Sequence, residues 1–177
     1  MPHAEPPTHM TATVSPSLAE AESLDDSALI RRILDYHSAH LRDLAAAAEL
    51  AEEIASAHAS AAFPERLPGE LRDMLDELQE HQAREELALF PAILKGRGPR
   101  LLAPVSTMTS EHDDVQDRLE RLVRLTEDFT PPAEASASWR RLYDLCRKFD
   151  QDFRTHIQFE ERVLFPRVTE SSFAAIK

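Results

Sequence analysis

The chain has 177 residues and a formal charge of −12, from 32 acidic and 20 basic residues, so it offers no basic face for nucleic-acid phosphates or an anionic membrane surface. A single cysteine, Cys146, excludes an intrachain disulfide framework and a thiolate metal site. No apolar run approaches the length of a membrane span, and residues 1–25 lack the apolar block of a secretion signal, which favours a soluble, cytoplasmic protein.

The composition predicts one helical domain between two short terminal segments. Residues 1–25 are expected to be a disordered N-terminal segment, because prolines recur there among serines and threonines. The domain is expected over residues 26–168, and residues 169–177 are expected to form a C-terminal tail. Only three glycines occur, while Ala, Leu, Glu and Arg dominate, which favours helix over sheet.

The first predicted helix begins after a cap at Asp25, Asp26 or Ser27 and is broken by Phe63-Pro64 and Leu67-Pro68-Gly69. Its inward positions alternate in steps of four and three, the spacing of a bundle seam: Ile30, Leu34, His37, Leu41, Leu44, Ala48, Ala51 and Ala55. A second helix stops at Pro91 or soon after. Its inward positions are Leu71, Met74, Leu78, His81, Glu85 and Ala88.

Two more helices complete the pattern. Pro104 suits the first turn of a third helix, whose seam comprises Val105, Met108, His112, Val115, Leu119 and Leu122. After Thr130-Pro131-Pro132, a fourth helix places inward Leu142, Leu145, Phe149, Phe153, His156, Glu160 and Val163. Because short connections make neighbouring helices antiparallel, the predicted fold is all-α, an up-down-up-down four-helix bundle.

Residues of the metal-ligand type recur on these stripes at a constant interval of 75 positions. The pairs are His37 and His112, His81 and His156, and Glu85 and Glu160. A carboxylate buried without a partner costs several kcal/mol, which a cation between the side chains would remove. A His and a Glu four apart on one helix reach the same centre. The six residues are therefore the candidate ligands of two metal ions, and hydrogen-bonded core histidines without metal are the alternative.

The donor types and their number limit the chemistry. Imidazole with carboxylate suits iron, manganese or zinc. If both glutamates bridge, each ion has two imidazoles and two carboxylates. An oxo or hydroxo bridge would add a fifth donor and leave one position open for a small diatomic ligand.

Other polar residues near the ligands either support the ligands or face solvent. Glu77 and Glu111 either orient an imidazole or relay a proton, or they face solvent. His40 has the same two readings. Glu86 and Glu161 are expected to face water, because each lies about 100° round the helix from the ligand before it.

Three further residues are placed by their height along the bundle. Phe90 and Phe165 are expected to cap the core below the metals and to exclude solvent. His58 continues the first seam, but 21 residues separate it from His37, about 31 Å along a straight helix. It is therefore expected at the far end of the bundle, outside the cluster.

With these motifs the chain resembles the hemerythrin-like proteins, and within them the repair-of-iron-centres group (the YtfE, ScdA and DnrN type), over roughly residues 30–168. The motifs are Tyr36-His37-Ser-Ala-His40, His58, His81-x3-Glu85-Glu86-x3-Phe90-Pro91, Ser110-Glu111-His112-Asp113 and His156-x3-Glu160-x4-Phe165-Pro166. Oxygen-carrying hemerythrins have His-x3-His on the third helix and His-x4-Asp on the fourth. This chain has Gln116 after His112-x3, and His-x3-Glu on its fourth helix.

The resemblance implies two iron ions in a non-haem di-iron centre, nitric-oxide chemistry under stress, and restoration of damaged iron-sulfur proteins. Many members carry an N-terminal cysteine-bearing domain that residues 1–25 do not contain, so nitric-oxide binding carries over more directly than cluster repair. An oxygen-binding or oxygen-sensing module is the alternative. A ferroxidase or peroxidase ranks below both, since those di-iron sites use Glu-x2-His pairs and more carboxylates. The residues leave open whether the chain is an enzyme, and its oligomeric state.

Overall fold

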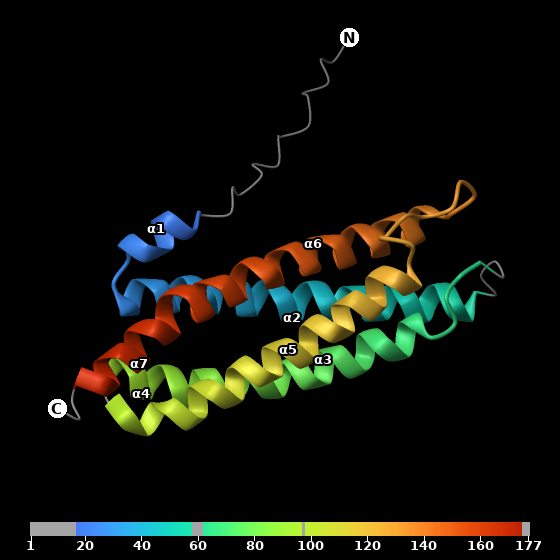
Figure 1. Ribbon diagram of the computed structural model, residues 1–177. Coiled ribbons are helices and arrows are strands. Elements are labelled where there is room, and N and C mark those ends of the chain that lie inside the picture. Colours follow the sequence, from blue (N-terminus) through green and yellow to red (C-terminus); the bar gives the residue numbers. More distant parts are fainter. Residues whose placement is uncertain (1–16, 58–61, 97, 175–177) are drawn as a thin grey trace, which may run out of the picture.

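The computed structural model describes residues 17–57, 62–96 and 98–174. Four antiparallel rods run the length of the molecule (Figure 1). They are α2 (Asp26–Ser56); α3 (Leu67–Arg84), extended by the π-helical turn η1 (Glu85–Leu89) and α4 (Phe90–Leu94); α5 (Leu102–Leu125), after the 3-10 turn η2 (Gly98–Leu101); and α6 (Ala137–Phe159), extended by the π-helical turn η3 (Glu160–Leu164) and α7 (Phe165–Ala174). The predicted all-α, up-down-up-down bundle is confirmed.

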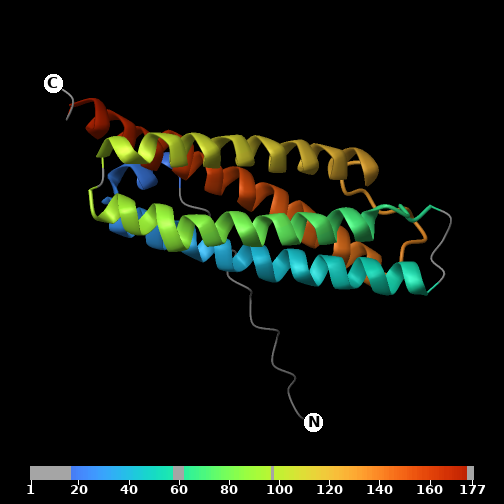
Figure 2. The same ribbon diagram turned by 90° about the horizontal axis from the view of Figure 1, so that it is seen from below.

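Helix α2 packs against α6 and α3, and α3 packs against α5. Figure 2 shows the same four rods from below, with the α2–α3 and α5–α6 connections at one end. None of the described helices is both long enough and apolar enough to cross a lipid bilayer.

Two separate clusters of buried apolar side chains fill the bundle, with a polar layer between them. On α2 one cluster ends at Tyr36 and the other begins at Leu44; on α5 the corresponding residues are Met108 and Val115. The inward-facing positions of these helices are polar between the two clusters. Burial of leucine, isoleucine and phenylalanine on both sides therefore fixes the position of the polar residues along the bundle axis. The core therefore positions the candidate site.

Both π-helical turns begin at a candidate ligand glutamate. A π turn holds more residues than an α turn, so it shifts the inward face by one position. The predicted inward residue Ala88 is consequently exposed, whereas Leu89 and Phe90 are buried. That part of the predicted stripe was wrong, because an α-helical period does not anticipate the wider turn.

The terminal segments contain more helix than the sequence predicted. Residues 18–23 fall in the segment expected to be disordered, yet they form α1 (Leu18–Ser23). Ser17 and Glu20 make a reciprocal capping box, and Ala21 is fully buried. In the expected tail, α7 continues the rod from Phe165 to Ala174, and Pro166 directly follows the wider turn η3.

The first rod ends at Ser56, before the two segments that were expected to break it. One of them, Leu67-Pro68-Gly69, forms the first turn of α3, where proline is tolerated because its missing N–H would have no partner. The predicted cap of the first rod is confirmed, since the Asp25 side chain accepts a hydrogen bond from the Ala28 N–H at 2.7 Å.

Candidate metal centre

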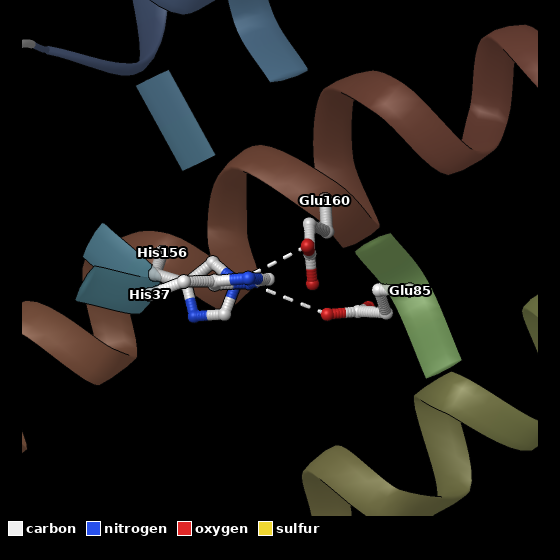
Figure 3. Close-up of side chains that lie close together, drawn as sticks. All are labelled: His37, Glu85, His156 and Glu160. Atoms are coloured by element: carbon white, nitrogen blue, oxygen red, sulfur yellow. Dashed lines mark hydrogen bonds and ion pairs between the residues drawn. The ribbon is translucent and has the colours of Figure 1, made fainter. Parts of the chain in front are cut away.

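The polar layer brings together all six residues that recur at the constant interval. Each rod contributes at least one imidazole, and the two glutamates begin η1 and η3. None of the six is more than 2% exposed: His37, His81, Glu85, His112, His156 and Glu160. Figure 3 shows four of them, with the Glu85 and Glu160 carboxylates directed at the imidazoles of His37 and His156.

The donor atoms form two groups that share both glutamates. Within each group, one atom from every residue lies within 4.8 Å of the others. One group is His37, Glu85, His156 and Glu160; the other is His81, Glu85, His112 and Glu160. This arrangement gives each group two imidazoles and gives each carboxylate access to both groups.

The imidazoles all present Nε2 to the carboxylates. Glu85 Oε2 lies 3.3 Å from Nε2 of both His37 and His81. Glu160 Oε2 lies 3.1 Å from His112 Nε2, and its Oε1 lies 3.1 Å from His156 Nε2. Donors that bind one ion at about 2.1 Å and at right angles are themselves about 3 Å apart. The spacing therefore fits a metal polyhedron.

The site has the unmet bonding capacity that a cation would satisfy. Both oxygens of Glu85 and of Glu160, and Nε2 of His81 and His112, are buried without a hydrogen-bond partner among the described residues. Buried polar atoms are rarely left unpaired, because each costs free energy. The residues present therefore fit a bound divalent or trivalent ion.

Electrostatics keep both carboxylates charged. Burial and the neighbouring Glu160 carboxylate raise the pKa of Glu85, but contacts with His37 and His81 outweigh them, and the net pKa is below its usual value. Burial likewise raises the pKa of Glu160, and His156 and His112 bring it well below its usual value. Anionic carboxylates are the form that a cation requires.

The imidazoles divide into two kinds. Burial lowers the pKa of His112, but contacts with Glu160 and Glu161 raise it to about 10. Burial also lowers the pKa values of His37 and His81, but the surrounding carboxylates, Glu85 foremost, together raise both above the usual value. Burial dominates at His156, whose pKa is lowered. Without metal, protons thus take the place of a cation at three imidazoles.

Three imidazoles are oriented by a glutamate at Nδ1. His37 Nδ1 lies 2.9 Å from Glu86 Oε1, and His112 Nδ1 lies 2.9 Å from Glu161 Oε1. Glu86 and Glu161 were expected to face water, and their side chains are 42% and 31% exposed, but the prediction missed their contacts with the imidazoles. A π turn rotates the chain less per residue than an α turn, which leaves these side chains nearer the site. The repeat gave the signal, because positions 86 and 161 are also 75 apart.

Glu111 and Glu77, which had the same two readings, differ in the structure. Glu111 Oε2 accepts a hydrogen bond from His81 Nδ1 at 2.8 Å and pairs with Arg84 Nη2 at 2.9 Å. Glu77 instead pairs with Arg118, and no imidazole of the described residues is bonded to it. A cleft of about 400 Å³ between α3 and α5 is lined by both glutamates and reaches His81.

Two phenylalanines and two further histidines complete the comparison with the sequence. Phe90 and Phe165 are buried and stack on His37 and His112, with ring centroids 5.9 and 6.1 Å apart, in the capping position predicted for them. His40 is 1% exposed, so its solvated reading is wrong. His58 lies outside the described residues.

We expect Glu111→Ala to weaken metal binding about 10–100-fold, because partners of ligating histidines have effects of this size. Glu77→Ala is the matched control, since Glu77 lies on α3 in the same cleft and pairs with Arg118 rather than with one of the four imidazoles of the site. Competition with a chromogenic chelator measures both affinities. Equal losses in the two variants would contradict the assignment of Glu111 to His81.

Known proteins match this chain over nearly the whole bundle. Residues 28–169 match the family described as the hemerythrin HHE cation binding domain. The iron-sulfur cluster repair protein DnrN of Neisseria gonorrhoeae is 39% identical over 136 residues, which are 77% of this chain and 86% of that protein. The iron-sulfur cluster repair protein YtfE of Musicola paradisiaca is 38% identical over 139 residues, 78% of this chain but 62% of that protein.

The chain thus spans only about three fifths of the YtfE relative, but most of DnrN. Helical architecture, the His and Glu donor groups and these matches agree. The chain belongs to the hemerythrin HHE cation-binding family and, within it, is of the repair-of-iron-centres type.

Proposed function

We propose that the chain holds two iron ions and acts in the repair of iron-sulfur centres under nitrosative or oxidative stress, with nitric oxide as its diatomic ligand. The single observation that supports this most is the pair of donor groups that share Glu85 and Glu160. Two buried carboxylates within reach of four imidazoles suit a pair of ions better than one.

The ligands of each ion follow from the groups. His37 and His156 would hold one ion, His81 and His112 the other, and the two glutamates would bridge them. When bound, such a centre supplies redox-active ions with an open position for a diatomic molecule. The relatives are the argument for iron and for repair, since both are named iron-sulfur cluster repair proteins.

The relative lengths bear on whether repair needs an additional domain. The matched region makes up 86% of DnrN, so a protein with little beyond this bundle bears the repair name. That coverage supports extending the repair of iron-sulfur clusters to this chain.

The protein's own side chains prepare the site for this role. Phe90 and Phe165 exclude water from one side of the ligands. Glu86, Glu111 and Glu161 orient their imidazoles and hold a proton at Nδ1, which directs Nε2 towards the ion. Three of the four imidazoles are therefore positioned by carboxylates of the chain itself.

Anaerobic titration tests the proposal. The protein reconstituted with Fe(II) is expected to bind two ions per chain, and added nitric oxide is expected to produce new visible absorption and EPR signals. The metal-free protein is the control. An iron-loaded protein that gives no signal with nitric oxide, but a reversible spectrum with oxygen, would replace this reading by the oxygen-binding one.

A further inference from the structure

The four imidazoles of the candidate centre are not equivalent at Nδ1. Glutamate oxygens lie 2.9, 2.8 and 2.9 Å from Nδ1 of His37, His81 and His112. Nδ1 of His156 is buried and has no hydrogen-bond partner among the described residues. One imidazole therefore lacks the support that the other three have.

The internal repeat shows where the symmetry is broken. Glu111, which orients His81, corresponds 75 positions earlier to Tyr36. An aromatic ring thus stands where the carboxylate for His156 would be expected, with the centroids of the Tyr36 and His156 rings 6.3 Å apart. The same half of the repeat has His40 where the other half has Val115, again 75 positions apart. The first half of the repeat therefore has no carboxylate at the position of Glu111, but it has an imidazole, His40, at the position of Val115.

His40 lies beside His156 and lacks another polar partner. Both of its ring nitrogens are buried and unpaired among the described residues. The rings around it are Tyr36, Phe149, Phe153 and His156, with the His156 centroid nearest at 5.2 Å. The carboxylate one turn along α2 belongs to Asp43, which already binds Lys148 at 2.7 Å and Arg42 at 3.1 Å.

The chemistry of the two imidazoles is complementary. An imidazole that binds a metal through Nε2 carries its proton on Nδ1 and needs an acceptor there. A neutral imidazole has one unprotonated ring nitrogen, which is such an acceptor. We propose that His40 is the positioning residue for His156, accepting the Nδ1 proton through one bridging water, the role that a glutamate has directly at the other three imidazoles. This inference rests on the proposed two-ion centre.

A difference between the two metal positions follows. A carboxylate partner makes an imidazole a stronger ligand, and a neutral acceptor does so less. At the position of His81 and His112 both imidazoles have a carboxylate, whereas at the position of His37 and His156 only one has. An ion held by His37 and His156 would therefore be the one that a chelator removes first.

Zinc alone is the probe that tests this, because it is diamagnetic and suits the same donors. In the zinc-loaded, ¹⁵N-labelled protein, long-range ¹H–¹⁵N spectra are expected to show a slowly exchanging His156 Nδ1–H and a single tautomer of His40. His40→Val is expected to speed that exchange and to weaken one zinc position about tenfold, without moving the signals of His81 and His112. His40→Gln, whose amide oxygen is an acceptor, is expected to restore both.

Val115→Ala is the matched control at the corresponding position of the other half, and it should leave the His156 signal unchanged. Two bound zinc ions with an unaltered His156 Nδ1–H in His40→Val would overturn the inference while the proposed centre stands. Failure of the wild-type protein to bind two zinc ions would overturn the centre itself. Rapid exchange between both His40 tautomers in the wild-type protein would also overturn the inference, even if no variant folds.

Discussion

Glu160→Ala and Glu85→Ala are each expected to lower the metal content from two ions per chain towards one or zero. Both donor groups include both glutamates, so a single truncation removes a ligand from each position at once. It also removes the negative charge that offsets the two ions in a fully buried site. Truncating one imidazole, by contrast, takes a donor from one group only.

Iron or zinc content after anaerobic reconstitution and desalting measures this effect, with circular dichroism to show that the bundle remains folded. Glu77→Ala is the structural control, because Glu77 pairs with Arg118 outside the site. His58→Ala is predicted from the sequence to keep both ions as well. A glutamate variant that retains two tightly bound ions would show that the carboxylates do not bridge.

The sequence predicted the bundle and the six-residue cluster for the same physical reason. Imidazoles and carboxylates occupy positions on apolar stripes, and an interval of 75 positions places the two halves at one height. Burial of side chains such as Leu44 and Met108 on either side then forces the polar residues together. Periodicity and an internal repeat are sufficient for that part of the structure.

The surroundings of the cluster could not be predicted in the same way. Ala88 and Glu86 were placed by an α-helical period, which the π turn at Glu85 alters. Whether Glu77 or Glu111 orients His81 depended on the partner that each glutamate meets in the fold. Glu77 pairs with Arg118 of another helix, which leaves Glu111 to contact His81. These contacts depend on how the helices pack against one another, which cannot be deduced from residue spacing along a single helix.

The metal-free protein is expected to lose stability as the pH rises from about 7 towards 10. The pKa of His112 is about 10 in the folded protein, against about 6.5 when unfolded. A raised pKa contributes stability that is fully present below pH 6.5 and is lost as pH rises through 10. His37 and His81 act in the same direction, since their pKa values are also raised.

The other buried groups act at the acidic side. The pKa of His156 is lowered by burial, and that of His40 is lowered well below its usual value by burial and by the neighbouring imidazoles. Their contributions are lost as pH falls below about 6.5. The lowered pKa values of Glu85 and Glu160 add a loss at still lower pH. Maximum stability without metal is therefore expected near neutral pH.

Thermal melts of chelator-treated and zinc-loaded protein between pH 7 and 9.5 distinguish this effect from general alkaline unfolding. We expect the midpoint of the metal-free protein to fall by roughly 5 °C or more, since about 2–4 °C corresponds to 1 kcal/mol at this chain length. Zinc replaces the protons on the imidazoles, so the loaded protein should not show the loss. Glu161→Gln removes one of the groups that raise the pKa of folded His112, so its loss of stability should be smaller and should be complete at a lower pH. A metal-free protein with a constant midpoint over this range would mean that protons do not take the place of the cation in the empty bundle.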